Sequence, residues 1–158
     1  MSRGDIAKNY FLNGYNCAQS VVMAFNDCIK IDEKILLMLS QPFGGGMGGM
    51  HEVCGTVSGM WIVLGSLYGD AQPKNPQKRN ELYARVRVLA NTFENDNHSL
   101  ICRELLGLVP LGSSKGLMGK NDARINKGKR ACPDLCKYAA DILEEYINNH
   151  KDEIVKAD

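Results

Sequence analysis

Six cysteines are the residues in this sequence best suited to chemistry. They are Cys17, Cys28, Cys54, Cys102, Cys132 and Cys136. A cysteine acts as a nucleophile or a metal ligand when its thiolate is stabilised, and the N-terminus of a helix does this through free N–H groups and the positive end of its dipole. The alternative for any single cysteine is that it is a small buried apolar residue.

Three of these cysteines are predicted at the starts of helices. Cys17 follows an asparagine that can cap a helix, and the glutamine three positions later can complete a capping box. Cys54 falls in the first turn of a helix that follows a glycine-rich loop. Cys132 precedes Pro133, and proline favours the first helical position, so Cys132 is the expected cap residue.

The remaining cysteine signals are weaker. Cys102 has Arg103 beside it and His98 one turn earlier, so positive charge is expected near its sulfur. Cys136 lies four residues after Cys132 and would share its helical face. The two could then bind a metal together, or one could resolve an oxidised form of the other.

His51 precedes Cys54 by three residues, about one helical turn. If the helix includes it, His51 could be a base, a hydrogen-bond partner or a ligand beside Cys54. The alternative is a surface histidine at a helix start.

A glycine-rich loop from Phe43 to Gly49 formally contains the Gly-x-Gly-x-x-Gly pattern of dinucleotide-binding proteins. Nucleotide binding is disfavoured, because the preceding segment is helical and no βαβ units follow. The favoured use is close approach, in which backbone N–H groups reach a thiolate, an anion or a cofactor edge and the loop gates access. The candidate cofactor-binding residues are Gly45, Gly46, Gly48 and Gly49.

Gly55 and Gly59 lie four residues apart on the predicted core helix. They present a smooth strip on which another helix can pack closely and bring other cysteines toward Cys54.

The apolar residues recur at helical spacing, and no segment alternates as a strand would. The sequence therefore predicts an all-α fold, a compact bundle of about five to seven helices with the glycine-rich loop before the central buried helix. The expected helices cover about Asp5–Leu12, a segment capped by Asn16, a segment from Asp32 to before Pro42, His51–Leu67, a charged helix ending near Phe93, Leu100–Leu106, and a last helix from Pro133 to about Asn149.

The length of 158 residues predicts a single domain covering 1–158. A net charge of +1 predicts no nucleic-acid partner, and the longest apolar stretch, Val53–Tyr68, is too short to span a membrane. The N-terminus lacks the pattern of a signal peptide, so we expect a cytoplasmic protein whose thiols stay reduced.

Two charged segments could be plain surface or could bind a partner. The irregular stretch Gly112–Arg130 has six basic residues from Lys115 onward and one acidic residue, which suits a solvated loop or, alternatively, an anion site. The charged helix over Gln77–Phe93 is either plain surface or one side of a homodimer.

The order of these motifs resembles the C_GCAxxG_C_C family, over most of the chain. The matching pieces are Asn16-Cys17-Ala18-Gln19-Ser20-Val21, the glycine loop with Cys54-Gly55-Thr56-Val57-Ser58-Gly59, Cys102-Arg103-Glu104-Leu105-Leu106-Gly107, and Cys132-Pro133-Asp134-Leu135.

The resemblance implies a helical domain with a redox role and four family cysteines, which correspond here to Cys17, Cys54, Cys102 and Cys132. Two features depart from the family pattern. Thr56 stands where the family has alanine, and Cys136 is close enough to Cys132 to compete for the last family position.

The leading hypothesis is that these four cysteines converge and act as catalytic thiols, with Cys54 a thiolate of low pKa that cycles through a disulfide. The partner would be a redox protein or a small-molecule substrate, and no cofactor is required. The alternative is a module in which the same four cysteines ligate zinc or an iron-sulfur cluster. A third hypothesis scatters the cysteines through the core as inert packing residues.

Overall fold

The computed structural model describes residues 1–113 and 131–155. Its elements are helical throughout those ranges, and a bridge between Val53 and Ile101 stands outside any strand. The elements are α1 (Arg3–Leu12), α2 (Cys17–Met23), α3 (Glu33–Ser40), η1 (Gln41–Phe43), α4 (Gly44–Met47), α5 (Gly55–Tyr68), α6 (Pro76–Asn97), α7 (Cys102–Leu105), α8 (Cys132–Asn149) and η3 (Lys151–Glu153). The predicted all-α fold is confirmed.

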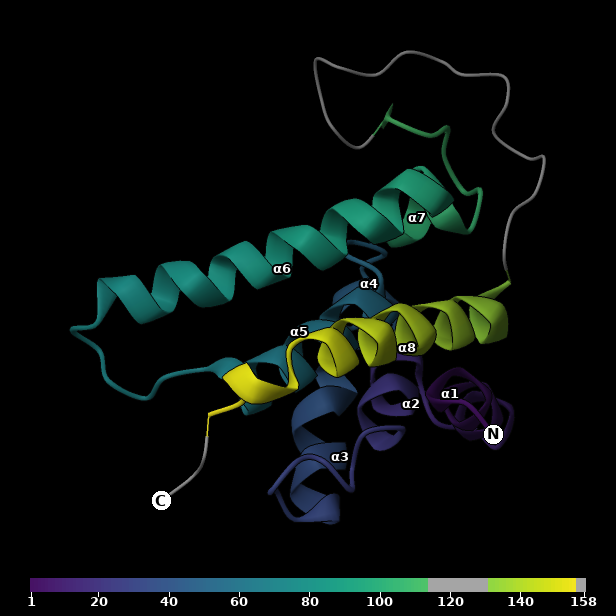
Figure 1. Cartoon of the computed structure of the whole chain (residues 1–158). Coiled ribbons are helices and arrows are strands. Elements are labelled where there is room, and N and C mark those ends of the chain that lie inside the picture. The colour runs from purple at the N-terminus through teal and green to yellow at the C-terminus, as the bar shows by residue number, and fades with distance from the viewer. Residues whose placement is uncertain (114–130, 156–158) are drawn as a thin grey trace.

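The central helix α5 is surrounded by the others (Figure 1). Helix α2 packs on α5, α1 packs along α8, and α6 lies across the opposite side. The largest fully buried side chains come from several of these helices and from the turn after α2, and they include Phe25, Leu36, Met60, Leu64, Phe93 and Leu143. Burying such side chains contributes about 1.5–3 kcal/mol each, so this core holds the helix ends that carry the cysteines in place.

Local signals in the sequence fix several helix boundaries. The Asn16 side chain accepts a hydrogen bond from the Gln19 amide at 2.9 Å, and the Asn16 amide donates to the Gln19 side-chain oxygen at 3.1 Å, so the predicted capping box of α2 is confirmed. Asp32 caps α3, which ends before Pro42 as predicted. Helix α1 begins two residues earlier than expected, because Ser2 caps it.

The segment before α5 differs from the prediction. The central helix begins at Gly55 and not near His51, whose backbone has a φ of +57° and therefore cannot continue a helix. The residues expected as a plain glycine loop form a 3₁₀ turn and the short α4, in which Gly45 and Gly46 have φ angles of +63° and +66°. These turns fold the segment back toward α7.

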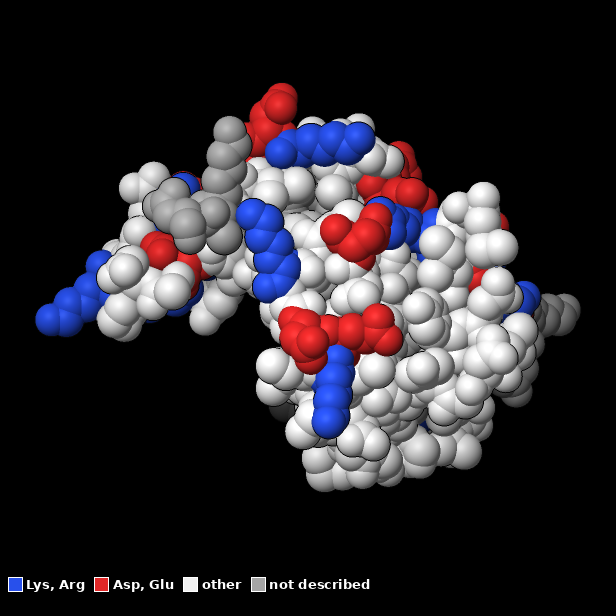
Figure 2. Space-filling model, turned by 90° about the horizontal axis from the view of Figure 1, so that it is seen from below, with Lys and Arg blue, Asp and Glu red and all other residues white. Residues whose placement is uncertain are grey.

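The surface mixes charges of both signs. Figure 2 shows one face of the molecule, on which basic side chains lie beside acidic ones and a broad area carries neither. Among the described residues, none of the helices combines the length and the apolar character that crossing a bilayer requires.

Candidate functional site

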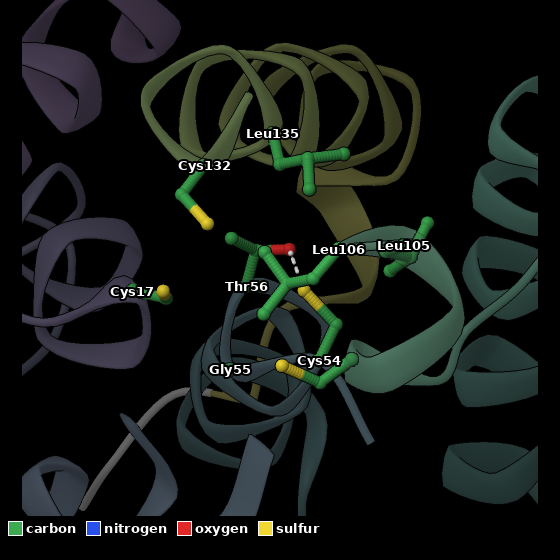
Figure 3. Close-up of a pocket in the computed structure, with 9 residues that line it drawn as sticks. Cys17, Cys54, Gly55, Thr56, Leu105, Leu106, Cys132 and Leu135 are labelled. Carbon is green, nitrogen blue, oxygen red and sulfur yellow. Dashed lines mark hydrogen bonds between the residues drawn. The ribbon is translucent and has the colours of Figure 1, made fainter. Parts of the chain in front are cut away.

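Four cysteines from four different helix starts line one small cleft (Figure 3). The cleft holds about 260 Å³ of space between atoms, part of it open to solvent. Its lining consists of Cys17, Cys54, Gly55, Thr56, Cys102, Leu105, Leu106, Cys132 and Leu135. The four cysteines are those that the sequence singled out, and the structure brings them together.

Each cleft cysteine stands at the N-terminal end of a helix. Cys17, Cys102 and Cys132 are the first residues of α2, α7 and α8, and Cys54 is the cap residue of α5. Cys132 was predicted as a cap, but Ala131 holds that position. Several helix N-termini therefore direct their positive ends toward one group of sulfur atoms.

On one side of the cleft, the thiols of Cys17 and Cys132 lie close enough to shift each other's pKa. The Cys132 thiol acts to lower the pKa of Cys17, but the Cys136 thiol and burial outweigh it and raise that pKa to about 12. The Cys17 thiol, followed by burial, raises the pKa of Cys132 as well. Both side chains are therefore protonated thiols at neutral pH.

On the other side, Cys54 is buried beneath Thr56, and its sulfur lies 3.1 Å from the Thr56 hydroxyl oxygen. Burial raises the pKa of Cys54 to about 11, although the Thr56 hydroxyl and the helix amides of Thr56 and Val57 act to lower it. The expected low pKa of Cys54 is therefore wrong. The helix amides act in the predicted direction, but the loss of water around the sulfur is the larger effect.

Cys102 has a histidine beside it. The Nδ1 atom of His51 lies 3.5 Å from the Cys102 sulfur, so the predicted histidine contact exists but with Cys102 rather than Cys54. Burial and the nearby Cys132 raise the pKa of Cys102, while Arg103 acts to lower it. His98, the residue expected near Cys102, instead ends α6 with a φ of +68°.

The loop that carries His51 is fixed to α7 by backbone bonds. The Cys102 amide donates to the Glu52 carbonyl at 2.6 Å, and the Arg103 amide donates to the His51 carbonyl at 3.1 Å. The Arg103 guanidinium also pairs with the Glu52 carboxylate at 2.9 Å. These contacts fix the position of the His51 imidazole relative to the Cys102 thiol. Local sequence patterns do not predict them, because the two segments are about fifty residues apart in the chain.

Glycines permit the close approaches around the cleft. A side chain on Gly46 would lie 2.6 Å from the Cys102 Cβ, so this glycine lets the turn pack on α7. A side chain at Gly45 or Gly49 would have no neighbour within 4 Å, and one at Gly48 would meet the Pro42 carbonyl oxygen only at 3.7 Å. The role of these glycines in holding a cofactor stays a prediction.

The predicted glycine strip on α5 is confirmed as a helix-packing surface. A Cβ atom on Gly55 would lie 3.0 Å from the Cys17 Cβ, and one on Gly59 would lie 2.9 Å from the Val21 Cβ. Helix α2 therefore packs so closely on α5 that Cys17 reaches the cleft beside Cys54.

The two cysteines outside the cleft differ from each other. Cys136 is fully buried one turn further along α8 and contacts Cys17, so Cys132 is the member of this pair that lines the cleft. Cys28 is exposed, and the Arg3 guanidinium lies 3.2 Å from its sulfur, beside the Asp27 carboxylate.

Within the part of the chain that the structure describes, no group of three or more Cys, His, Asp or Glu side chains is arranged to hold a metal ion. The basic stretch predicted as a candidate anion site lies outside the described residues from position 114 onward.

Fold and site together define a helical protein with a cleft of converging cysteines. The family model described as "Putative redox-active protein (C_GCAxxG_C_C)" matches residues 15–146. The chain therefore belongs to the C_GCAxxG_C_C family. No curated protein and no solved structure matches the chain significantly.

Proposed function

We propose that this protein carries out reversible thiol–disulfide chemistry in the four-cysteine cleft, with Cys17 and Cys132 forming the disulfide. The observation that carries the proposal is that these two thiols, which lie far apart in the chain, line the same small cleft and lie close enough for each to shift the pKa of the other. Two cysteines whose side chains enter one small cleft can reach disulfide geometry with limited movement of the backbone. Family membership and the gathering of all four predicted cysteines at one cleft support the same function.

The reaction exchanges one disulfide for another. The sulfur of Cys132 loses its proton and attacks a disulfide of a small molecule or a redox protein, so a mixed disulfide forms and one thiol leaves. The Cys17 sulfur then attacks Cys132, the bond to the partner breaks, and the second partner thiol leaves with a proton. The protein loses two electrons and two protons, and the partner disulfide gains both.

Cys102 is the cleft thiol with a base beside it. The His51 imidazole, whose Nδ1 atom lies 3.5 Å from the Cys102 sulfur, is placed to accept the Cys102 proton. In the oxidised protein the Cys102 thiolate is suited to attack the Cys132 sulfur of the Cys17–Cys132 disulfide, because both residues line the same small cleft; a Cys102–Cys132 bond then forms and Cys17 leaves as a thiolate that takes up a proton. Cys54 is buried and hydrogen-bonded to Thr56, so a partner disulfide reaches it less readily than it reaches Cys17 or Cys132.

The alternative, a cysteine-ligated zinc or iron-sulfur module, needs at least three ligands around one point. The same four cleft cysteines would have to supply them, and metal analysis of protein purified without oxygen distinguishes this alternative from the thiol couple.

A paired assay tests the proposal. Protein purified without oxygen is analysed for metal, and its free thiols are counted before oxidation by oxidised glutathione, after oxidation, and after reduction by dithiothreitol. The expected result is negligible metal and a reversible loss of about two thiols per chain. Stoichiometric metal, or thiols that react only after denaturation, would contradict the proposal.

A further inference from the structure

We infer that Cys136 is a third redox thiol, which exchanges with Cys132 for the shared partner Cys17 and so moves the disulfide from the cleft into the core. The inference rests on the function proposed above. It concerns a buried nucleophile that the two-thiol reaction leaves unused and that lies outside the four family positions.

Cys17 is the common neighbour of two sulfurs on one face of α8. Its side chain lines the same small cleft as Cys132, and the Cys132 and Cys136 thiols both shift its pKa. A second contact fixes Cys136 there, because its sulfur lies 4.0 Å from the Cys17 carbonyl oxygen. Residues four apart on a helix lie about 5–6 Å apart at their Cβ atoms, so a sulfur facing both can bond to either.

The two thiols that compete for Cys17 differ in their access to solvent. Cys132 is partly exposed at the start of α8 and lines the cleft, whereas Cys136 is 0% exposed and belongs to the hydrophobic core. A partner disulfide can therefore reach Cys132 but not Cys136. Oxidising equivalents would enter at Cys132 and reach Cys136 through Cys17.

The exchange step conserves electrons and atoms. The Cys136 sulfur loses its proton and attacks the Cys17 sulfur of the Cys17–Cys132 disulfide. The bond between Cys17 and Cys132 breaks, the new bond joins Cys17 to Cys136, and Cys132 leaves as a thiolate that takes up a proton. No oxidant is consumed beyond the partner disulfide that made the first bond.

The exchange would change which cysteine is available in the cleft as a free thiol. The oxidised sulfurs become shielded from reductants by the core, and Cys132 returns to the cleft as a free thiol able to attack a second disulfide. Helix α8 would then hold one stored disulfide while its first residue remains reactive.

A time course of linkages tests the inference. Reduced protein is treated with oxidised glutathione, samples are acid-quenched and alkylated, and disulfides are mapped by mass spectrometry. The expected result is an early Cys17–Cys132 linkage, followed by a Cys17–Cys136 linkage and about one equivalent of label at Cys132. Raising the pH should speed the second phase, because exchange requires a thiolate.

Variants separate this inference from the proposed function. C136A should stop at the Cys17–Cys132 linkage with no label at Cys132, C132S should form the Cys17–Cys136 linkage far more slowly because the entry thiol is missing, and C28S should behave as the unmodified protein. A wild-type Cys17–Cys132 linkage with Cys136 remaining a thiol at all times would overturn the exchange and leave the proposed function standing. No linkage at Cys17 at all would overturn both, and the wild-type time course decides this without any variant.

Discussion

The two sides of the cleft use their thiols differently. On one side, Cys17 and Cys132 face each other as thiols that shift each other's pKa, which suits them to form a bond. On the other side, Cys54 and Cys102 each contact a different kind of group, the Thr56 hydroxyl and the His51 imidazole. The difference teaches that convergence alone does not assign roles, since the immediate neighbour of each sulfur decides whether it is suited to pairing or to proton transfer.

The largest effect on the difference between the two sides is expected from the substitution C17S. The substitution removes the sulfur shared by Cys132 and Cys136, so we expect complete loss of the reversible disulfide with oxidised glutathione. The control C54S should keep it, because Cys54 is hydrogen-bonded to Thr56 and to no thiol partner. Thiol counts and disulfide mapping are carried out on both variants. A disulfide that is retained in C17S and lost in C54S would contradict the assignment of Cys17 to the disulfide-forming side of the cleft.

The buried side should make stability depend on pH. The pKa of Cys54 is about 11 in the folded protein against an ordinary value of 9.0, so the unfolded thiol ionises first as pH rises. The contribution of Cys54 is complete below about pH 9 and is lost as pH rises toward 11, by roughly 2–3 kcal/mol. Urea unfolding across this pH range measures the free energy of unfolding, which should fall less steeply with pH in C54A than in the unmodified protein. An equal pH dependence in the two proteins would contradict the role of Cys54 burial.

The position of Cys17 depends on close packing between α2 and α5. In Gly59→Ala the new methyl meets Val21 at 2.9 Å, so we expect a loss of about 1–3 kcal/mol in the free energy of unfolding and slower oxidation of Cys17. Gly65→Ala on the same helix has open space, and we expect a gain of up to about 1 kcal/mol. Urea denaturation measures the free energy of unfolding of both variants. Equal changes in the two would contradict the claim that close packing of α2 on α5 positions Cys17.

On the other side of the cleft, a substitution of His51 tests whether this residue acts as a base for Cys102. Asparagine tolerates a positive φ, so H51N keeps the backbone turn while removing the base. We expect the alkylation rate of Cys102 by iodoacetamide near neutral pH to fall about tenfold, with the rate at Cys132 unchanged. H98N is the matched control, because His98 has a similar φ of +68° and lies outside the cleft lining. Equal rates in H51N and the unmodified protein would exclude His51 as the base.

Local signals predicted much of the fold and the membership of the cleft. Asn16, Asp32 and Pro133 mark helix starts because capping and proline geometry act within a few residues. The strip of Gly55 and Gly59 correctly indicated the close helix contact that brings Cys17 to Cys54.

The features that sequence reasoning missed depend on tertiary contacts. The pKa of Cys54 follows from how completely other helices exclude water, and a helix start cannot reveal that. His51 was assigned to Cys54 by helical spacing, but its left-handed backbone breaks the helix and turns the ring toward Cys102. The contact of Cys136 with Cys17 had only one signal, its four-residue spacing from Cys132.

The central claim is that distant cysteines meet as adjacent thiols in the reduced native protein, and a trivalent arsenical tests it most directly. Phenylarsine oxide bridges two thiols only when they are close together. The account predicts that about one equivalent binds without denaturant and protects Cys17 and Cys132 from iodoacetamide, while exposed Cys28 remains reactive. Absence of binding to the folded protein, or binding that leaves both Cys17 and Cys132 open to alkylation, would contradict it.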